Sequence, residues 1–462
     1  MGTVSHARKR EMTNISENYL NCGSREMTQL LSDVRLPQFY RVKQKFDGTH
    51  LTDNTIVSVI KSGLGEVLRG KKSAENQNIR GMRIAVTAGS RGVANIALIL
   101  KTIVSFLKEN GAAPFIIPAM GSHGGATAEG QKNLLEGYGI TEKNMGCPIH
   151  SSMDVKKIGK TADGRDVYID RLAAEADGII VVGRIKPHTA FRGPYQSGLM
   201  KMMAIGLGKQ YGASVCHAEG FQRMGYNVQT FGNAIIKHAN ILCGVGIVEN
   251  AFDETRKIKV MSKEDIGRME PELLKEAEQH MPRILWPACD VLIVDEIGKN
   301  FSGDGMDPNV TGSFATPYAS GGIQAERICL LDLSPETHGN GMGTGMASVI
   351  TRRIFNQLDV NMMYINAMTC KNLNGSRIPC VMTNDKEAIQ FCLKTCIHAD
   401  RQHPKIIRIC NSQFLEHIWI SEALAAELPE AAEIVSGPFP LPFDAEGNLT
   451  DRLPRQRGQR FQ

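Results

Sequence analysis

The sequence predicts an α/β fold built from two α/β domains, with mainly parallel sheets and an active-site cleft between them. Short apolar runs alternate with segments of helical spacing, which is the pattern of a parallel sheet covered by helices. The length of 462 residues favours two or three domains at about 150 residues each. Hydrophobic residues make up 42% of the chain, so each domain can bury an ordinary core.

The first half of the chain contains three apolar runs, bounded by glycine or polar residues, that are typical of buried strands. These strands are predicted at 82–90, 113–120 and 178–184. Each run is followed by a segment with the apolar spacing of a helix. These helices are predicted at 93–110, 126–137 and 198–209. The alternation favours a parallel sheet.

A second α/β unit is expected after the charged amphipathic segment 262–281, which we interpret as the connector between the domains. The segment 437–448 is rich in proline and glycine and is expected to be irregular. The predicted strands of the second unit are 289–298, 327–334 and 405–410, and its predicted helices are 346–359 and 385–398.

These patterns divide the chain into four parts. The start of the chain is polar and lacks the apolar stretch found in signal peptides. We expect a disordered N-terminal extension at 1–26, a first α/β domain at 27–265, a second α/β domain that closes the cleft at 285–435, and an irregular C-terminal tail at 436–462.

Charge and cysteine content exclude several classes of protein. The 53 Lys and Arg residues exceed the 48 Asp and Glu residues by five and form no long basic block, so no nucleic-acid partner is expected. The apolar runs are too short to span a bilayer, so no membrane partner is expected either. The 11 cysteines are scattered, with no CxxC pair. This is typical of a reduced cytoplasmic protein rather than a disulfide framework or a zinc module.

Three polar loops that follow predicted strands carry the candidate chemistry. They contain Arg91, His123 and His188, and ligands of open α/β sheets bind outside the carboxyl ends of the strands. Glycines beside Arg91 and His123 let the backbone approach a ligand closely. Two imidazoles can transfer protons near neutral pH, and an arginine suits a carboxylate. The residues favour a two-base enzyme for a small anionic substrate, or else side chains that only hydrogen-bond within their loops.

The segment PHTAFRGPYQSGLMK (187–201), followed by CHAEG (216–220), resembles the signature of the lactate racemase superfamily, whose members use a nickel-pincer nucleotide. In that family a PH motif precedes an SGG-type segment that ends in lysine, and a further histidine follows. GSHGGATAEG (121–130) resembles the family's G-T-H-R-x-x-T segment, and GSR (89–91) resembles its arginine-bearing segment. Four motifs in the same order, over about residues 80–220, are far more specific than any one of them.

The resemblance implies a role for each matching residue. Lys201 would hold the nickel-pincer nucleotide, a Ni pyridinium-3,5-bisthiocarboxylate mononucleotide, through a covalent thioamide, and His217 would bind the nickel. His123 and His188 would be the two catalytic bases, one for the hydroxyl of each enantiomer. Arg91 would bind the substrate carboxylate.

The chain also departs from the family pattern. Ala88 and Gly89 stand where the family has acidic residues before the arginine, and Gly124 stands where it has an arginine. An insertion of about three residues (192–195) follows the PH motif. These departures resemble a divergent branch of the family and leave the identity of the substrate open. Together with the polar loops of the second domain, they favour a larger polyhydroxy acid, such as a sugar acid, over lactate.

Two glycine-rich loops of the second domain, 294–309 and 333–348, are candidates for closing over the site. Lys299 in the first loop is expected to contact the substrate, by loose resemblance to a lysine in the family's second domain. The second loop carries Asn340 as a further substrate contact and is expected to run into a helix, whose N-terminus could bind an anion. The alternative is a flexible connection, since G-x-G runs are common in loops.

The resemblance implies a nickel-pincer nucleotide-dependent racemase or epimerase that inverts the α-carbon of a 2-hydroxy acid by reversible hydride transfer. Residues 27–265 would then be the cofactor-binding and catalytic domain, and the partners would be a small-molecule 2-hydroxy acid and the enzymes that assemble the cofactor. Two alternatives remain open, a nicotinamide-dependent dehydrogenase and a non-catalytic protein that binds a hydroxy acid or a nucleotide. The first lacks a G-x-G-x-x-G after its first strand, and the second would need neither Lys201 nor His217.

Overall fold

The computed structural model describes residues 25–69, 79–451 and 453–454, which form two compact units. The first unit contains residues 47–281 and 316–319, and the second unit contains the rest. The expected disordered extension at 1–26 lies outside the described residues, apart from the two residues that begin helix α2 (Arg25–Leu31). None of the helices in the described ranges is long and apolar enough to cross a membrane.

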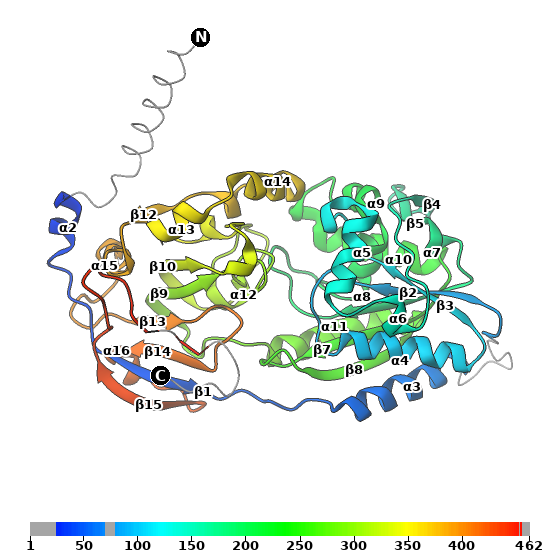
Figure 1. The fold of residues 1–462 in the computed structure, drawn as a ribbon, viewed down its shortest axis with the longest axis horizontal. Coiled ribbons are helices and arrows are strands. Elements are labelled where there is room, and N and C mark those ends of the chain that lie inside the picture. The colour runs from blue at the N-terminus through cyan, green and yellow to red at the C-terminus, as the bar shows by residue number, and fades with distance from the viewer. Residues whose placement is uncertain (1–24, 70–78, 452, 455–462) are drawn as a thin grey trace, which may run out of the picture. The chain divides into compact units, whose positions relative to one another are not determined.

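The first unit is built on a five-stranded sheet in the order β3-β2-β6-β7-β8 (Figure 1). Strands β3, β2, β6 and β7 run parallel, and β8 returns antiparallel to β7. The three strands predicted in the first half of the chain are therefore neighbours in one parallel sheet, which confirms the α/β fold class. The strands of this unit are β2 (Arg83–Ala88), β3 (Ala113–Pro118), β4 (Val155–Lys160), β5 (Asp166–Asp170), β6 (Gly178–Arg184), β7 (Ile241–Glu249) and β8 (Thr255–Ser262).

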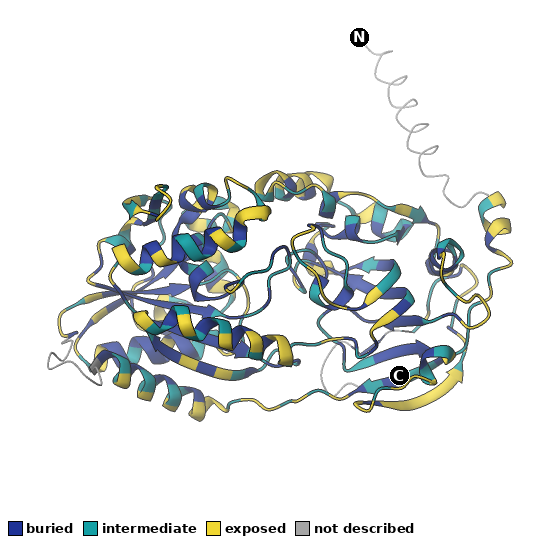
Figure 2. Cartoon of the chain, turned by 180° about the vertical axis from the view of Figure 1, so that it is seen from behind, coloured by how far each residue is buried: buried dark blue, intermediate teal, exposed yellow. Residues whose placement is uncertain are grey.

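Helices cover both faces of this sheet, because successive side chains of a strand point to opposite faces. Ile84 and Val86 of β2 enter a core shared with α3 and α4, whereas Ala85 faces a second core formed with α10 and α11. Figure 2 shows these helices with buried residues along one side and exposed residues along the other. The helices of the unit are α3 (Asp53–Arg69), α4 (Ile96–Glu109), α5 (Ala128–Gly137), α6 (Glu142–Met145), α7 (Arg171–Ala174), α8 (Leu199–Lys201), α9 (Lys209–Cys216), α10 (Met224–His238) and α11 (Lys263–His280).

Helix α11 belongs to the first unit, so the prediction that 262–281 connects the domains is wrong. The hydroxyl of Ser262 caps the helix by accepting a hydrogen bond from the backbone N–H of Asp265 at 3.3 Å. Ile266, Leu273 and Leu274 form its apolar stripe and pack into the core beside β7 and β8. Most of the charged residues of the segment lie on the outer side of the helix, whereas Glu270 is buried.

The second unit is built on an eight-stranded sheet in the order β12-β11-β10-β9-β13-β14-β1-β15. The first five strands run parallel, whereas β14, β1 and β15 are antiparallel. The strands are β1 (Phe39–Gln44), β9 (Ala288–Ile297), β10 (Gln324–Leu333), β11 (Val349–Thr351), β12 (Cys380–Met382), β13 (Ile406–Ile409), β14 (His417–Ser421) and β15 (Ala432–Phe439). The helices after α2 are α12 (Pro308–Thr311), α13 (Arg352–Gln357), α14 (Val360–Cys370), α15 (Asp385–Thr395) and α16 (Glu422–Ala425).

Some predictions for the second unit differ from the structure. The helix predicted at 346–359 is wrong in its first half, because the β-branched stretch of β11 pairs with β10 before α13 begins. The expected first domain at 27–265 includes β1, which instead pairs with β14 and β15 of the second unit. The expected irregular tail begins inside β15. These strands lie at or near a sheet edge and carry short, mixed patterns.

Candidate active site

Three neighbouring strands of the first unit lead into the loops that carry the candidate residues. Arg91 follows β2, His123 follows β3 and His188 follows β6, and these strands are adjacent in the order β3-β2-β6. Because the strands are parallel, their carboxyl ends meet at one edge of the sheet. The fold thus brings the three loops to the same edge.

Lys201 is the last residue of α8 and directly precedes a π-helix, Met202–Leu207. Such helices are rare and often occur at functional sites. This one packs tightly against the strand-end loops, because a Cβ atom on Gly206 would lie 2.5 Å from the carbonyl oxygen of Ala119. In addition, the N–H of Gly121 donates to the carbonyl oxygen of Gly206 at 3.2 Å. The backbone that carries Lys201 is therefore held against the loop that carries the first candidate histidine.

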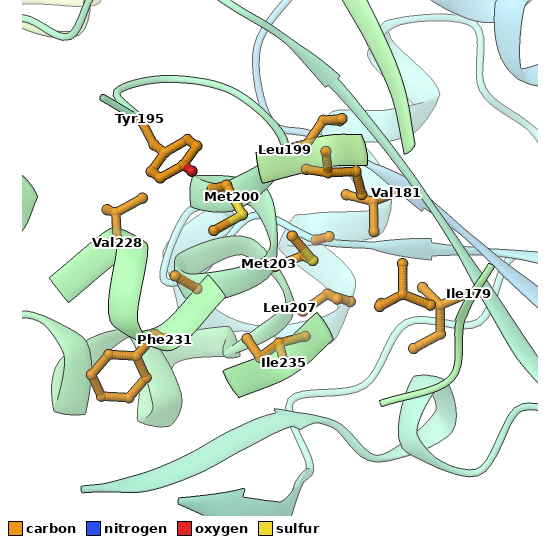
Figure 3. Packing of buried hydrophobic residues seen from close by; sticks show 14 of the residues in the cluster. Ile179, Val181, Tyr195, Leu199, Met200, Met203, Leu207, Val228, Phe231 and Ile235 are labelled. Carbon is orange, nitrogen blue, oxygen red and sulfur yellow. The ribbon is translucent and has the colours of Figure 1, made fainter. Parts of the chain in front are cut away.

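The hydrophobic core fixes α8 from the other side. Leu199, Met200 and Met203 are fully buried, and they lie among residues of β6 and α10 (Figure 3). Burying side chains of this size stabilises a fold by about 1.5–3 kcal/mol each. Lys201 therefore extends from a well-packed part of the backbone.

Lys201 and His188 are in direct contact, with Nζ of the lysine 2.9 Å from Nε2 of the imidazole. The other ring nitrogen, Nδ1, accepts a hydrogen bond from the backbone N–H of Ala190 at 3.0 Å. A neutral His188 in this arrangement carries its proton on Nε2. An uncharged Lys201 would accept a hydrogen bond from this Nε2–H group, whereas a charged Lys201 would require an unprotonated Nε2.

The surroundings of His188 keep its imidazole neutral. Burial lowers the pKa of His188 well below its ordinary value, and the neighbouring basic groups Lys201, Lys186, Arg192 and His217 lower this pKa further. An imidazole that stays neutral throughout the physiological range can exchange a proton with a substrate hydroxyl.

Hydrogen bonds also fix the backbone of His188. Its N–H donates to Oε1 of Gln196 at 2.8 Å, and Nη1 of Arg192 donates to its carbonyl oxygen at 2.6 Å. The ring of Phe191 lies against the imidazole, with the centroids 4.3 Å apart. The inserted segment 192–195 is therefore part of the framework that positions this histidine.

His217 follows α9 and lies close enough to His188 to lower its pKa. The ring of Phe221 is beside both imidazoles, with centroids 6.2 Å from His217 and 6.4 Å from His188. The neighbouring Cys216 is buried in the core, and burial raises the pKa of its thiol to about 12. Lys201, His188 and His217 thus form one cluster, to which the thiol does not belong.

His123 and Arg91 form the second part of the site. Nδ1 of His123 lies 2.5 Å from Oγ of Ser90, which directly precedes Arg91. Gln131 holds the loop, because its Nε2 donates to the carbonyl oxygens of Gly121 at 2.9 Å and of His123 at 3.2 Å. The side chains of His123 and Arg91 are exposed, so a ligand can reach them from solvent.

Lys209, which sequence reasoning does not single out, ties these loops together. Its side chain is fully buried. Nζ donates to the carbonyl oxygen of Pro118 at 2.5 Å and to Oε1 of Gln131 at 3.2 Å, and it lies 3.1 Å from Oδ2 of Asp170. The start of α9 is thereby linked to the end of β3. The available sequence signal is a lysine directly after an apolar, glycine-rich helix.

Glu270 of α11 holds the start of α8 and is also missed by sequence reasoning. Its buried carboxylate accepts a hydrogen bond from the backbone N–H of Met200 at 3.0 Å. Burial raises the pKa of Glu270 to about 7, although the N–H groups of Met200 and Leu199 act against this rise. The sequence signal is its spacing, since it stands four residues from both Ile266 and Leu274 on the apolar side of α11.

Lys299 and Asn340 lie together in the second unit. The N–H of Lys299 donates to Oγ1 of Thr337 at 3.1 Å, and this hydroxyl donates to the carbonyl oxygen of Asn340 at 2.9 Å. Nζ of Lys299 donates to Oδ1 of Asn366. The side-chain oxygen of Asn340 accepts from the N–H of Met342 at 3.3 Å, so this buried amide stabilises its own loop.

The loop 333–348 leads into β11 and not into a helix. The prediction that it supplies a helix N-terminus for an anion is therefore wrong. The glycines of this loop instead allow close packing, since a Cβ atom on Gly345 would lie 1.9 Å from the carbonyl oxygen of Asn374.

Within the described ranges, no group of three or more His, Cys, Asp or Glu side chains could hold a metal ion. The ten cysteines in these ranges are all free thiols.

Comparison with known proteins identifies the segment that contains the site. Residues 40–224 match the family model described as the lactate racemase N-terminal domain. The structure aligns with that of the lactate racemase apoprotein from Thermoanaerobacterium thermosaccharolyticum at 14% identity and a TM-score of 0.49, over 80% of this chain and 94% of that chain. No curated protein sequence matches the chain. Because the matched segment contains all four sequence motifs, the resemblance inferred from them is confirmed for residues 40–224.

Proposed function

We propose that the protein is a nickel-pincer nucleotide-dependent racemase or epimerase that inverts the α-carbon of a 2-hydroxy acid by reversible hydride transfer. The contact between Lys201 and His188 beside His217, inside the matched family segment, supports this function most strongly. A protein that only binds an anion would require neither a lysine–histidine pair nor a second imidazole.

The residues of this cluster fit a covalently attached cofactor. Acylation of a lysine requires an uncharged amine, and a neutral His188 with its proton on Nε2 would donate a hydrogen bond to Lys201 in that form. His217 would supply an imidazole, which is a suitable ligand for nickel. When bound, the cofactor would supply the hydride acceptor for the α-hydrogen of the substrate.

The remaining steps depend on side chains of this chain. His123 and His188 would take the hydroxyl proton of one enantiomer and return a proton to the other, and each such base contributes roughly two to four powers of ten in rate. Arg91 would hold the substrate carboxylate in a bidentate ion pair. Lys299 and Asn340 remain candidates for further substrate contacts.

Attachment at Lys201 has a consequence for His188. An acylated lysine nitrogen has no available lone pair, so the Nε2–H group of His188 would lose its acceptor. A base role requires an unprotonated Nε2 and therefore a proton on Nδ1, which the N–H of Ala190 opposes in the observed arrangement. We expect the imidazole to change its hydrogen-bond partners when the lysine is modified.

Chiral separation of products tests this function. The protein, produced together with the cofactor-assembly enzymes, should interconvert the enantiomers or epimers of at least one stereo-defined 2-hydroxy acid. His123→Ala and His188→Ala should each abolish interconversion and leave the circular dichroism spectrum unchanged. His403→Ala, which removes an exposed histidine of the second unit, should retain activity. Activity in either site variant would contradict the two-base assignment.

A further inference from the structure

The antiparallel ribbon of β4 and β5 forms a small sheet of its own and packs against α9 and α10 (Figure 1). His217 lies in the turn between these two helices. The N–H of Arg165, at the end of the ribbon's own turn, donates to the hydroxyl of Thr161 at 2.9 Å. The N–H of Thr161 donates in return to the carbonyl oxygen of Arg165 at 2.8 Å. The ribbon thus presents an arginine from a closed turn to the helices around His217.

Four neighbouring side chains hold the guanidinium of Arg165 in one orientation. Its Nε donates to Oδ1 of Asp163 at 3.1 Å, and its Nη2 lies 2.6 Å from Oδ2 of the same carboxylate. Its Nη1 donates to Oε2 of Glu219 at 3.0 Å and to Oδ1 of Asn227 at 2.8 Å. The guanidinium also lies on the ring of Phe231, 4.9 Å from its centroid. Arg165 therefore offers its N–H groups in a fixed geometry.

Asn227 of α10 passes this contact on to the backbone beside His217. Its side chain is fully buried, and its Nδ2 donates to the carbonyl oxygen of Cys216 at 2.8 Å. A guanidinium can only donate hydrogen bonds, so Arg165 requires the oxygen of the Asn227 amide on its side. The nitrogen of the amide then faces Cys216. Arg165 thus determines which way the amide points, and the amide determines where this carbonyl group lies.

His217 lies between two points that are held by Arg165. Before it, the carbonyl oxygen of Cys216 accepts the hydrogen bond from the buried amide. After it, the carboxylate of Glu219 pairs with the guanidinium itself. Within the turn, the N–H of Gly220 donates to the carbonyl oxygen of His217 at 2.9 Å. One guanidinium therefore restrains the chain on both sides of this histidine.

We propose that Arg165 and Asn227 are positioning residues that hold His217 in place for the nickel of the cofactor. This inference rests on the proposed function, in which His217 is the ligand that the protein supplies. Both residues act through the backbone of 216–219 rather than on the metal ion. A histidine whose turn is already ordered loses less conformational freedom when it binds a metal ion, so the metal is held more tightly.

Retention of nickel tests the proposal. Variants produced together with the cofactor-assembly enzymes are incubated with EDTA, and the nickel that remains bound is measured over time by inductively coupled plasma mass spectrometry. Arg165→Met and Asn227→Leu should lose nickel roughly tenfold faster than the wild type or more, since the outer partners of metal ligands contribute about 10–100-fold to metal affinity. Both variants should keep the adduct at Lys201 in intact mass spectra.

Two further variants separate positioning from general stability. Asn227→Asp can still accept from Arg165 but offers no N–H group to Cys216, so it should lose nickel as fast as Asn227→Leu. Asn250→Leu is the matched control, because Asn250 is also a buried asparagine of the first unit and bonds to the backbone N–H groups of Phe252 and Glu254. It should retain nickel like the wild type.

Hydrogen exchange of the cofactor-free protein gives a readout that does not depend on the cofactor. The N–H of His217 donates to the carbonyl oxygen of Ala213 at 2.9 Å. This amide and that of Gly220 should exchange about two- to tenfold faster in Arg165→Met and Asn227→Leu, which is the factor that one lost hydrogen bond corresponds to. In Asn250→Leu both amides should exchange at the wild-type rate.

Each outcome decides between the proposals. Wild-type rates of nickel loss in Arg165→Met and Asn227→Leu, or an equal acceleration in Asn250→Leu, would overturn the positioning role. If Asn227→Leu does not fold, as judged by circular dichroism, Arg165→Met decides, because it changes a partly exposed side chain. Absence of the Lys201 adduct from the wild-type protein would overturn the proposed function, whereas faster exchange at His217 would still support the hold of Arg165 and Asn227 on this turn.

Discussion

Replacing Glu270 with glutamine should remove a pH dependence from the stability of the first unit. The carboxyl of Glu270 is 1% exposed and accepts a hydrogen bond from the N–H of Met200. Burial raises its pKa from an ordinary value of 4.5 to about 7. The folded protein therefore binds this proton more tightly than the unfolded chain does.

The sign and size of the effect follow from this difference. Below pH 4.5 the carboxyl is protonated in both states, and its contribution to stability is complete. As the pH rises from 4.5 to about 7, the unfolded chain releases the proton first, so the free energy of unfolding falls. At about 1.4 kcal/mol per pKa unit, the full loss is roughly 3 kcal/mol. Glutamine does not titrate, so the variant should not show this loss.

Urea unfolding at several pH values, followed by circular dichroism, measures the effect. Between pH 5 and pH 8 the wild-type protein should lose about 2–3 kcal/mol more than Glu270→Gln. Glu278→Gln, which changes an exposed residue of the same helix, should behave like the wild type. Parallel pH profiles for the wild type and Glu270→Gln would refute the reasoning, because the buried carboxyl would then not be the titrating group.

Two further predictions concern the framework of the site. Lys209→Met leaves the carboxylate of Asp170 buried without its cation, so the free energy of unfolding in urea should fall by about 3–5 kcal/mol. The double variant Lys209→Met/Asp170→Asn should recover part of this stability. If the losses of the two single variants simply add in the double variant, the pairing of Lys209 with Asp170 is contradicted. Gly206→Ala should lower the free energy of unfolding by about 1–3 kcal/mol, because the new Cβ atom would lie 2.5 Å from the carbonyl oxygen of Ala119. Gly137→Ala should not lower it, because no atom lies within 4 Å of the new Cβ position. Equal thermal stability of these two alanine variants would contradict the packing of the π-helix.

The sequence predicts the central strands well because they are buried on both faces. The apolar run of β6, for example, stands out against its neighbours and ends at the predicted residues 178–184. Strand β1 is different, since it buries only Phe39, Val42 and Gln44 and leaves the other residues partly exposed. Its partners include Ser421, and no local pattern indicates a pairing between residues so far apart in the chain. Such strands therefore require the three-dimensional structure.

The sequence likewise predicts one part of the candidate site and not the other. The positions of Arg91, His123 and His188 follow from the order of apolar strands, which is visible in the sequence. The contact between His188 and Lys201 depends on the path of an irregular loop and on a π-helix, whereas the apolar spacing of 198–209 predicts an ordinary helix. Glu270 acts on this helix from 70 residues away, so its role becomes clear only once α11 is placed against α8.

Intact mass of the protein, produced together with the cofactor-assembly enzymes, tests the central claim most directly. The account predicts a covalent adduct on the wild-type protein and on Lys237→Ala, which removes an exposed lysine of α10. The adduct should be absent from Lys201→Ala. An unmodified wild-type protein, or an adduct that persists in Lys201→Ala, would contradict the assignment of Lys201 as the attachment site.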